Sequence, residues 1–492
     1  MRAKSHYRQV RARGHTTNVA LRYRPCSAHP CLAMGASADF STRRFPRRQG
    51  RSPTARPPRL SNDARVLAPF IARHWSSLAG AGGRLSCELP STRRCRARSG
   101  AGRHRYPCCV PIFAFIEDGH PFTSALDGFR ARVEQEAPET APGPAVVSSE
   151  IRARAAGDGT FALDRFYCSL QRWPVAGAPF MASSLYWAAQ DGVARWCTFP
   201  VEPYLAAVEP YLTGRGLLTA EGGLRVLRYV PLRRFTFRAP RRDGLAGSEI
   251  GKFKRRTRLL ESYERMDRVA RAVAASAPGF DVPAPRGVDE EYSLYFQDAA
   301  RGTDLAVLAA SDPRALPRAA AVLAVLHQVP CAGLPAVDEG AFHRGIERDL
   351  AWIAFHAPAL VTLVADASAA LADPPPIEAE VTCHGDFVPS HVLDDGGRLT
   401  VIDLDLAQRG DPYRDVAMLL ASLPVDAPDV AVDERAIVDA YGRTAARRLD
   451  RRRLGWHRVA AEVYYLALAF SKDRPVDPAR LQAAVAALDA AQ

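Results

Sequence analysis

The sequence predicts an α+β protein in which a small antiparallel sheet precedes a mainly helical part. Three observations support this class. Apolar and basic residues alternate along 224–238 (LRVLRYVPLRRFTFR), as in strands with one buried face. Asp-Gly separates two β-prone runs near residue 396, which is a strong hairpin signal. Beyond residue 411 the pattern is helical, and a hydrophobic content of 47% is enough to build a core.

The first 110 residues differ in composition from the rest. They contain 23 arginines and lysines against 3 acidic residues, so the +13 net charge of the chain arises in this segment. Because apolar periodicity is absent, we expect residues 1–110 to be a disordered Arg-rich tail or the translation of a mis-assigned start. Interleaved aromatic residues are too sparse to predict nucleic-acid binding. An organelle transit peptide has a similar composition but is much shorter.

Prolines and aromatic residues set the next boundaries. Pro138, Pro142 and Pro144 mark a linker over residues 111–146, and the globular part is expected to begin near Val147. Aromatic residues are frequent from 163 to 211, which indicates buried surface without a motif. No apolar run reaches the ~18 residues of a membrane span, and no signal core opens the chain. The ten cysteines form no zinc or disulfide pattern, so a cytoplasmic location with reduced thiols is expected.

Four elements follow along the chain. Residues 224–238 predict two strands of a hairpin or one bulged strand, interrupted at Pro231. Residues 248–255 (SEIGKFKR) predict a strand on which Lys252 and Lys254 share one face. These are two of only four lysines in the chain, whereas 62 of the 66 basic residues are arginine. Helices are predicted over 257–275 and 313–329, with a strand at 292–297 between them.

The stretch 382–415 (TCHGDFVPSHVLDDGGRLTVIDLDLAQRGDPYRD) carries the candidate chemistry. With the hairpin tip centred on Asp395-Gly396, Asp386 and Asp403 lie at the same end of the hairpin. Asp405 shares the face of Asp403 as long as the strand continues. The segment therefore predicts three carboxylates in one place.

Converging carboxylates repel one another unless a cation or a shared proton offsets their charge. Oxygen ligands without clustered thiolates favour Mg²⁺ over zinc, and Mg²⁺ held by one or two carboxylates usually also holds substrate phosphates. The alternative is an Asp-rich turn on a solvated surface, but the flanking residues Val381, Phe387, Val392 and Ile402 are apolar. The pattern therefore predicts a magnesium site.

The motifs His384-Gly385-Asp386, Ile402-Asp403 and Gly410-Asp411-Pro412, followed by Asp415, resemble the catalytic signature of the aminoglycoside phosphotransferase and choline kinase family. The resemblance implies a protein-kinase-like fold with a nucleotide-binding lobe at 147–298 and a catalytic and substrate lobe at 299–492. It implies that Asp386 accepts the proton of a substrate hydroxyl and that Asp403 binds the Mg²⁺ that bridges the nucleotide phosphates. His384, Asp411 and Asp415 are implied as structural support.

The same resemblance assigns a nucleotide site. It implies that Lys252 pairs with the phosphates, with Lys254 as the reserve, and that Glu261 or Glu264 pairs with the lysine. Gln297 lies where the hinge between the lobes would hold adenine through backbone groups. The glycine-rich phosphate loop of kinases is absent.

One position departs from the family pattern, since His391 stands where an asparagine is usual. Mg²⁺ accepts imidazole nitrogen poorly, so His391 is either a ligand of a weakly held second metal or an orienting residue. A loop histidine that only makes hydrogen bonds is the alternative. Asp405 is the remaining candidate metal ligand.

These observations predict an enzyme that transfers the γ-phosphoryl group of ATP, or of GTP, to a hydroxyl of a small molecule such as an aminoglycoside, choline or a sugar-like compound. Neither nucleic acid nor a membrane is an expected partner. A metal-dependent phosphohydrolase and a nucleotide-binding pseudokinase of little activity remain open. The acceptor is expected to bind between 338 and 373 and after 432, where a cationic compound would require the carboxylates Glu347, Asp349, Asp433 and Glu434.

Overall fold

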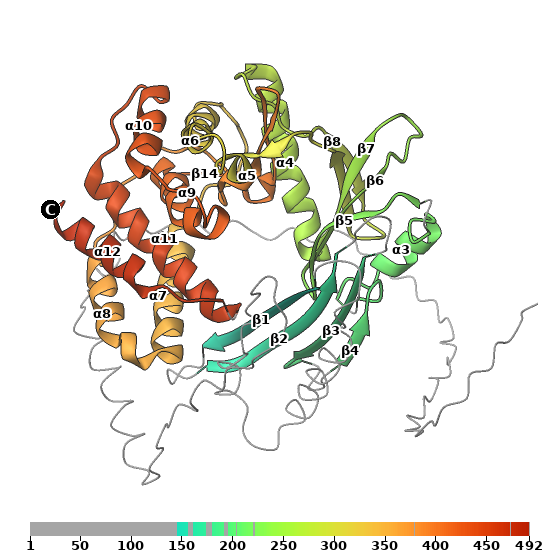
Figure 1. The fold of residues 1–492 in the computed structure, drawn as a ribbon, viewed down its shortest axis with the longest axis horizontal. Helices are drawn as coiled ribbons and strands as arrows, with labels where there is room; N and C mark the ends of the chain where they lie inside the picture. The colour runs from blue at the N-terminus through green and yellow to red at the C-terminus, as the bar shows by residue number, and fades with distance from the viewer. Residues whose placement is uncertain are drawn as a thin grey trace, which may run out of the picture. The chain divides into compact units, whose positions relative to one another are not determined.

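The computed structural model describes residues 145–155, 161–173, 180–190, 195–202, 204–219, 222–377, 379–472 and 474–491 (Figure 1). The predicted tail at 1–110 and all but the last residues of the predicted linker at 111–146 lie outside these ranges. The first described strand begins at Ala145.

An antiparallel sheet of four strands opens the described part of the chain. Its strands are paired in sequence order, as β1 (Ala145–Ala155), β2 (Phe161–Arg172), β3 (Met181–Ala188) and β4 (Arg195–Thr198). The aromatic residues that the sequence marks as buried surface belong here, since Phe166 and Tyr186 are almost fully buried. We call this element the first sheet.

A second antiparallel sheet of five strands follows the short helix α3 (Val208–Gly214). Its spatial order is β5 (Arg225–Val230), β6 (Arg234–Pro240), β7 (Ser248–Phe253), β9 (Leu294–Asp298) and β8 (Pro285–Asp289). Helix α4 (Arg256–Ser276) connects β7 to β8 and buries Leu259, Met266 and Val269. The predicted hairpin, the lysine-bearing strand, the helix and the strand at 292–297 are all confirmed.

The remaining elements are mainly helical, with short strands around the candidate chemistry. They are β10 (Thr303–Asp304), α5 (Leu305–Leu308), α6 (Ala315–Leu326), α7 (Glu339–His356), η3 (Pro358–Leu360), α8 (Val361–Ala370), β11 (Val381–Cys383), η4 (Pro389–His391), β12 (Val392–Asp395), β13 (Arg398–Val401), η5 (Leu404–Leu406), β14 (Gln408–Gly410), α9 (Pro412–Asp426), α10 (Glu434–Thr444), α11 (Arg451–Ser471) and α12 (Pro478–Asp489). No helix in the described ranges is long and apolar enough to span a membrane.

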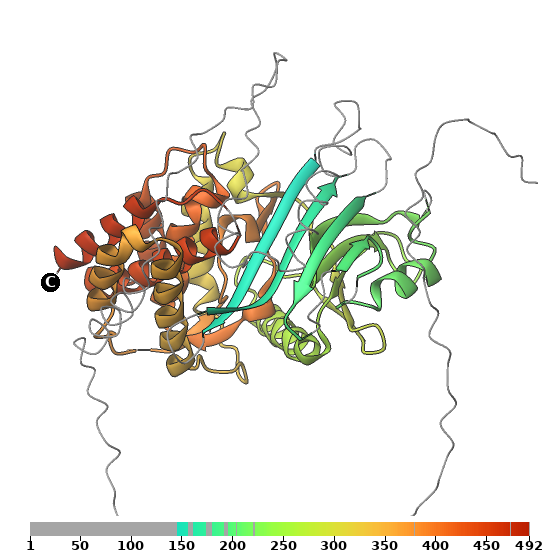
Figure 2. The same ribbon diagram turned by 90° about the horizontal axis from the view of Figure 1, so that it is seen from below.

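Two hydrophobic cores place the candidate site. The larger core joins α4 to α6, α9, α10 and the 392–401 hairpin, so it fixes the second sheet's helix against the candidate catalytic segment. The other core joins the first sheet to α7, α8, α11 and α12. The opposite face of the first sheet contacts Leu232 between β5 and β6, so this sheet touches both the helices and the second sheet (Figure 2). The predicted α+β class is confirmed.

Candidate active site

The hairpin in the candidate segment forms, but its register differs from the prediction. Leu393 pairs with Thr400 and Asp395 pairs with Arg398, so the turn is Gly396-Gly397, one residue later than expected. Both glycines have positive φ, at 64° and 98°. Two-residue hairpin turns that match the twist of the strands need positive φ at both central positions, and Gly-Gly meets this need better than Asp-Gly flanked by a second glycine.

Asp403 and Asp405 are not brought together by strand alternation, as the sequence suggested. Strand β13 ends at Val401, and Asp403 adopts a left-handed conformation with φ 62° and ψ 43°. The chain then enters the 3₁₀ turn η5, which contains Asp405. A non-glycine residue in this region is strained, and such residues cluster at functional sites. The two carboxylates nevertheless meet, because both contact the same lysine.

Lys252 is that lysine. Its Nζ donates a 2.8 Å hydrogen bond to Asp403 Oδ1 and lies 3.4 Å from Asp405 Oδ1. Lys254, directly after the end of β7, pairs with the other oxygen of Asp405. Burial alone would lower the pKa of Lys252, but the charges of Asp403 and Asp405 raise it, so the ammonium stays charged. The predicted face shared by the two lysines is the one turned towards the carboxylates.

The prediction of Asp405 as a metal ligand does not agree with its contacts. Oδ1 accepts from the Tyr295 hydroxyl and faces Lys252, while Oδ2 pairs with Lys254. The side chain is 3% exposed. Because η5 turns this carboxylate towards β7 and β9, its lone pairs are used by protein groups. Asp405 is therefore placed to hold the two lysines.

Asp403 is the carboxylate with an oxygen to spare. Its Oδ2 lies 3.4 Å from Arg234 and 3.7 Å from His391 Nε2, which are both longer than strong hydrogen bonds. Burial raises the pKa of Asp403, but the charges of Lys252, His391 and Arg234 bring it well below its usual range. An ionised carboxylate with one loosely engaged oxygen is a suitable donor for Mg²⁺.

His391 faces two ways. Its Nδ1 lies 2.9 Å from the backbone carbonyl oxygen of Asp386, and since a carbonyl only accepts, Nδ1 must carry the proton. Its Nε2 points to Asp403. The orienting role and the ligand role predicted for this histidine are therefore both compatible with its position, one at each ring nitrogen.

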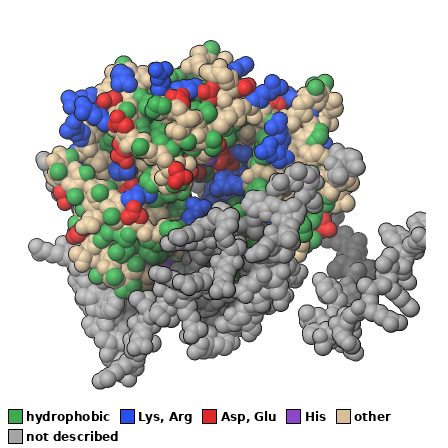
Figure 3. All heavy atoms as spheres, viewed as in Figure 1, with side chains coloured by type: hydrophobic (Ala, Val, Ile, Leu, Met, Phe, Trp, Pro, Cys, Tyr) green, Lys and Arg blue, Asp and Glu red, His purple; other side chains and the backbone are tan. Residues whose placement is uncertain are grey.

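Asp386 lies between β11 and η4 and is half-buried. Its carboxylate receives no hydrogen bond from a side chain of the described residues. The charges of Arg228 and Arg234 are close enough to interact with it. In Figure 3 basic and acidic side chains lie together in a hollow near the centre of the view. The predicted proton acceptor thus has free lone pairs beside the candidate metal donor.

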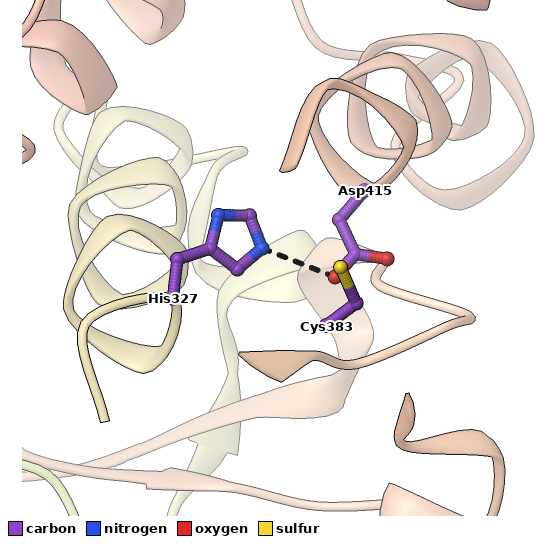
Figure 4. A group of neighbouring side chains, drawn as sticks. All are labelled: His327, Cys383 and Asp415. Atoms are coloured by element: carbon purple, nitrogen blue, oxygen red, sulfur yellow. Dashed lines mark hydrogen bonds and ion pairs between the residues drawn. The ribbon is translucent and has the colours of Figure 1, made fainter. Parts of the chain in front are cut away.

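Asp415 on α9 fixes the loop that carries Asp386. It accepts from the backbone N–H groups of His384 at 2.6 Å and Gly385 at 3.0 Å, and it lies 3.2 Å from His327 Nε2. Figure 4 shows this carboxylate between His327 and Cys383. Although burial raises the pKa of Asp415, hydrogen bonding with His327 lowers it below the usual value. Since its oxygens are engaged, this group of side chains is a brace for the loop and not a metal site.

Two further supports agree with the sequence prediction in position. His384 Nε2 lies 2.9 Å from the backbone oxygen of Ile402, which joins the Asp386 loop to the segment that carries Asp403. Asp411 caps α9 by accepting from Tyr413 N–H at 3.0 Å and pairs with Arg453 at 2.7 Å. Both residues hold the backbone that presents the carboxylates.

The expected pairing of Glu261 with Lys252 is wrong. Glu261 is 42% exposed and pairs with Arg258 and Arg265 on its own helix, three residues before it and four after it. On a helix these spacings place side chains on one face, so Arg258 and Arg265 are close enough to pair with the Glu261 carboxylate. Gln297 lies at the end of β9, paired with Ile250 and buried. Its role towards adenine stays a prediction.

The sequence did not predict the contacts that hold the turn between β5 and β6. Glu202 accepts from Leu232 N–H at 3.2 Å and from the Tyr229 hydroxyl at 2.9 Å, while Arg255 donates to the Leu232 carbonyl at 3.1 Å. Leu232 has φ 64°. The turn brings Arg234 to Asp403. Arg234 did not stand out in the sequence because arginine is so abundant. No short-range signal links Glu202 to the turn.

Comparisons with known proteins show what the segment that carries these residues is similar to. Residues 232–461 match the family described as "Phosphotransferase enzyme family". The chain resembles a choline/ethanolamine kinase family protein from Mesorhizobium loti at 20% identity, with a TM-score of 0.37, over 57% of this chain and 90% of that one.

A macrolide 2'-phosphotransferase from Brachybacterium faecium is 23% identical over 58% of this chain and 98% of its own, with a TM-score of 0.36. A choline kinase from Streptococcus pneumoniae is 14% identical over 57% and 99%, with a TM-score of 0.38. Nothing among the curated proteins matches the chain. The segment that matches the phosphotransferase enzyme family carries Lys252, Asp386, Asp403 and Asp415.

Proposed function

We propose that this chain is a small-molecule kinase that transfers the γ-phosphoryl group of ATP, with GTP as the alternative nucleotide, to a hydroxyl group. The observation that supports this best is the 2.8 Å contact of Lys252 with Asp403, while Arg234 is close enough to interact with both Asp403 and Asp386. A buried, charged lysine, an ionised carboxylate and a second carboxylate without a side-chain donor are the three groups that phosphoryl transfer requires.

The residues present fit a divalent cation. Asp403 Oδ2 is the oxygen donor, and His391 Nε2 lies on the same side. Mg²⁺, when bound, neutralises charge on the phosphates of the nucleotide. The chain's own part is to hold Lys252 beside Asp403, and Asp405 does this by pairing with Lys252 on β7 and with Lys254 directly after it. Lys252 then supplies a point charge to the phosphates.

Asp386 is the proposed acceptor of the hydroxyl proton. Its carboxylate is half-buried, and its backbone is fixed from two sides, by His391 at the carbonyl and by Asp415 at the preceding N–H groups. Positioning of this kind is a large part of catalysis, because a displacement of ~1 Å lowers rates by about 10²-fold. A cytoplasmic location, where thiols stay reduced, is part of the proposal.

The alternative of a phosphohydrolase built on histidines fits the geometry less well. His384 is fully buried and its Nε2 is bonded to the Ile402 carbonyl, so this nitrogen is not a ligand of a metal shared with Asp386. The pseudokinase alternative is tested by activity, and His391→Asn is the informative variant, since it places the usual amide oxygen beside Asp403.

The test is a panel of hydroxyl compounds incubated with the full chain and Mg·ATP or Mg·GTP, with products scored by mass. We expect one compound class to be phosphorylated by the wild type and by His391→Asn. Asp386→Ala should yield no product yet still bind Mg·AMP-PNP in a calorimetric titration. Product formation by Asp386→Ala would refute the proposed role of Asp386, and phosphoester hydrolysis without nucleotide would support the phosphohydrolase.

A further inference from the structure

Two consecutive arginines, at the end of the turn between β5 and β6, lie near different carboxylates. Arg233 Nη1 is 3.7 Å from Glu150 on β1, and its side chain is 46% exposed. Arg234 is the first residue of β6, and its Nη1 is 3.4 Å from Asp403 Oδ2, with 17% of the side chain exposed. Among the described residues, Asp403 is the one carboxylate that forms an ion pair with Arg234. The turn therefore directs one arginine to the first sheet and the next to the candidate metal donor.

The backbone N–H groups of the turn are not available to an anion. Of the three residues between β5 and β6, Pro231 has no N–H, and the Leu232 N–H donates to Glu202 at 3.2 Å. The Arg233 N–H donates to the Val230 carbonyl at 3.1 Å. Phosphate-binding loops rich in glycine use such N–H groups, and this turn contains no glycine. Positive charge for a phosphate at this turn must therefore come from a side chain.

The turn that presents Arg234 is fixed from several sides. Leu232 is 2% exposed and belongs to a small hydrophobic core of the first sheet. Its N–H is held by the buried Glu202, and its carbonyl accepts from Arg255 at 3.1 Å. With φ 64° Leu232 is strained, and strained residues persist only where surrounding contacts determine their conformation. These contacts therefore determine where the side chain of Arg234 begins.

Arg234 shares one oxygen of Asp403 with the proposed metal site. Ligands of one Mg²⁺ lie about 2 Å from the ion, so a phosphate oxygen on the same ion lies within about 4 Å of Asp403 Oδ2. Two cations at one carboxylate oxygen repel each other, and an anion that binds both offsets this repulsion. A guanidinium group presents several N–H donors that match phosphate oxygens. Arg234 can therefore move from Asp403 to the phosphates when the nucleotide binds.

We propose that Arg234 is a further catalytic residue, which binds the β- and γ-phosphates of the nucleotide through its side chain. In kinases a glycine-rich loop covers these phosphates, and here an arginine side chain takes over that contact. Glu202 is a positioning residue, because it acts on Arg234 through the turn. This inference rests on the proposed kinase function and adds a residue that the sequence did not single out.

The step that Arg234 assists balances without a further reagent. The acceptor oxygen forms a bond to the γ-phosphorus as the bond from that phosphorus to the β,γ-bridging oxygen breaks. The hydroxyl proton passes to Asp386, and the electron pair of the broken bond leaves with the nucleoside diphosphate. Negative charge therefore grows on the β-phosphate, and a guanidinium beside it offsets that charge most strongly in the transition state. Loss of Arg234 should lower kcat as well as nucleotide affinity.

The test compares Arg234→Gln with Arg233→Gln in the full chain. Calorimetry measures the binding of Mg·AMP-PNP, Mg·ADP and AMP. We expect Arg234→Gln to bind Mg·AMP-PNP and Mg·ADP about tenfold more weakly or worse, because it loses hydrogen bonds between charged groups. AMP lacks the β- and γ-phosphates and should bind this variant as it binds the wild type. Arg233→Gln is the matched control, since Arg233 pairs with Glu150, and should bind all three nucleotides as the wild type does.

Two further variants separate phosphate binding from a structural role. Arg234→Lys keeps the charge but not the planar fork, so it should recover part of the lost affinity for Mg·AMP-PNP. Glu202→Ala should weaken Mg·AMP-PNP binding when Arg234 is present and have no further effect in the Arg234→Gln background, because it acts through Arg234. A purely structural role of Arg234 would instead weaken AMP binding to the same extent and lower the urea midpoint.

Equal Mg·AMP-PNP binding by the wild type and Arg234→Gln would overturn the inference and leave the kinase function standing. An unchanged kcat in Arg234→Gln, an equal loss of affinity in Arg233→Gln, or a parallel loss of AMP binding would overturn it as well. A wild-type chain that binds neither Mg·AMP-PNP nor Mg·ADP would contradict the proposed function itself, and this inference with it.

Discussion

Gly385 and Gly396 form a matched pair that tests how closely the Asp386 loop is packed. Both have positive φ, at 83° and 64°, so alanine is strained at either position. They differ in their surroundings. A Cβ on Gly396 meets nothing within 4 Å, whereas a Cβ on Gly385 overlaps the backbone carbonyl of Leu406. Gly385→Ala must therefore move one backbone against another.

The expected losses of unfolding free energy follow from the backbone strain at positive φ and from the steric overlap of the new Cβ. Gly396→Ala has only the conformational strain, about 1–2 kcal/mol. Gly385→Ala adds an overpacking cost of about 1–3 kcal/mol, so its loss of unfolding free energy should be about 2–5 kcal/mol. The displaced residue lies next to Asp386, and a shift of ~1 Å there lowers the rate about 10²-fold. Gly396→Ala should leave the rate unchanged.

The assay pairs urea denaturation of the full chain with phosphoryl transfer to an acceptor found in the panel. Mg·AMP-PNP binding is measured as well, because Lys252 and Asp403 do not depend on a side chain at position 385. The reasoning is refuted if the two alanine variants lose equal stability, or if Gly385→Ala keeps the wild-type rate while remaining folded.

Three other variants test the supports of the site. Burial raises the pKa of Asp411, but His457, Tyr413 N–H and Arg453 lower it from 3.8 to about 2. Ionised Asp411 therefore stabilises the fold above pH 3.8 by about 2 kcal/mol. This contribution is lost as the pH falls towards 2, so Asp411→Asn should flatten the acid limb of a stability profile measured with urea. Asp415→Asn should cost about 1–3 kcal/mol in the same assay and lower kcat more than it raises the KM for ATP. Glu202→Ala should release the β5–β6 turn, cost about 1–3 kcal/mol and raise the KM for ATP.

Each of these expectations has a contrary result. An Asp411→Asn protein with the wild-type acid profile would show that Asp411 does not carry the acid dependence. An unchanged kcat in Asp415→Asn would separate the brace from the chemistry. A Glu202→Ala protein with lowered stability and an unchanged KM would make the turn structural alone.

Local signals predicted the parts of the site that local contacts determine. The hairpin near residue 396 and the strand carrying Lys252 each depend on residues within a few positions, and each is found in the structure. The sequence Asp395-Gly396-Gly397 contains two adjacent candidate turns, and Gly396-Gly397 forms in place of the predicted Asp395-Gly396. This difference changes which residues pair across the hairpin, but each side chain stays on the predicted face.

Contacts between distant segments were beyond such signals. Strand alternation predicts that Asp405 shares the face of Asp403. Asp403 instead adopts a left-handed conformation, and Asp405 contacts the two lysines. The family resemblance implies that Glu261 pairs with Lys252, whereas the Glu261 carboxylate pairs with arginines one helical turn away. Glu202 lies 30 residues from the backbone N–H of Leu232 that it binds, and no pattern in the sequence around either residue predicts the contact.

The first sheet has a practical consequence for anyone who trims this chain to the matched segment 232–461. Strands β1 to β3 cover apolar faces of α7 and α11, including Ile353 and Trp456, and α12 covers more of α11. Cutting away residues 145–198 and everything after 461 would leave those faces in water, where large apolar patches promote aggregation. A soluble fragment must therefore keep the strands and the last helix, although neither lies in the matched segment 232–461.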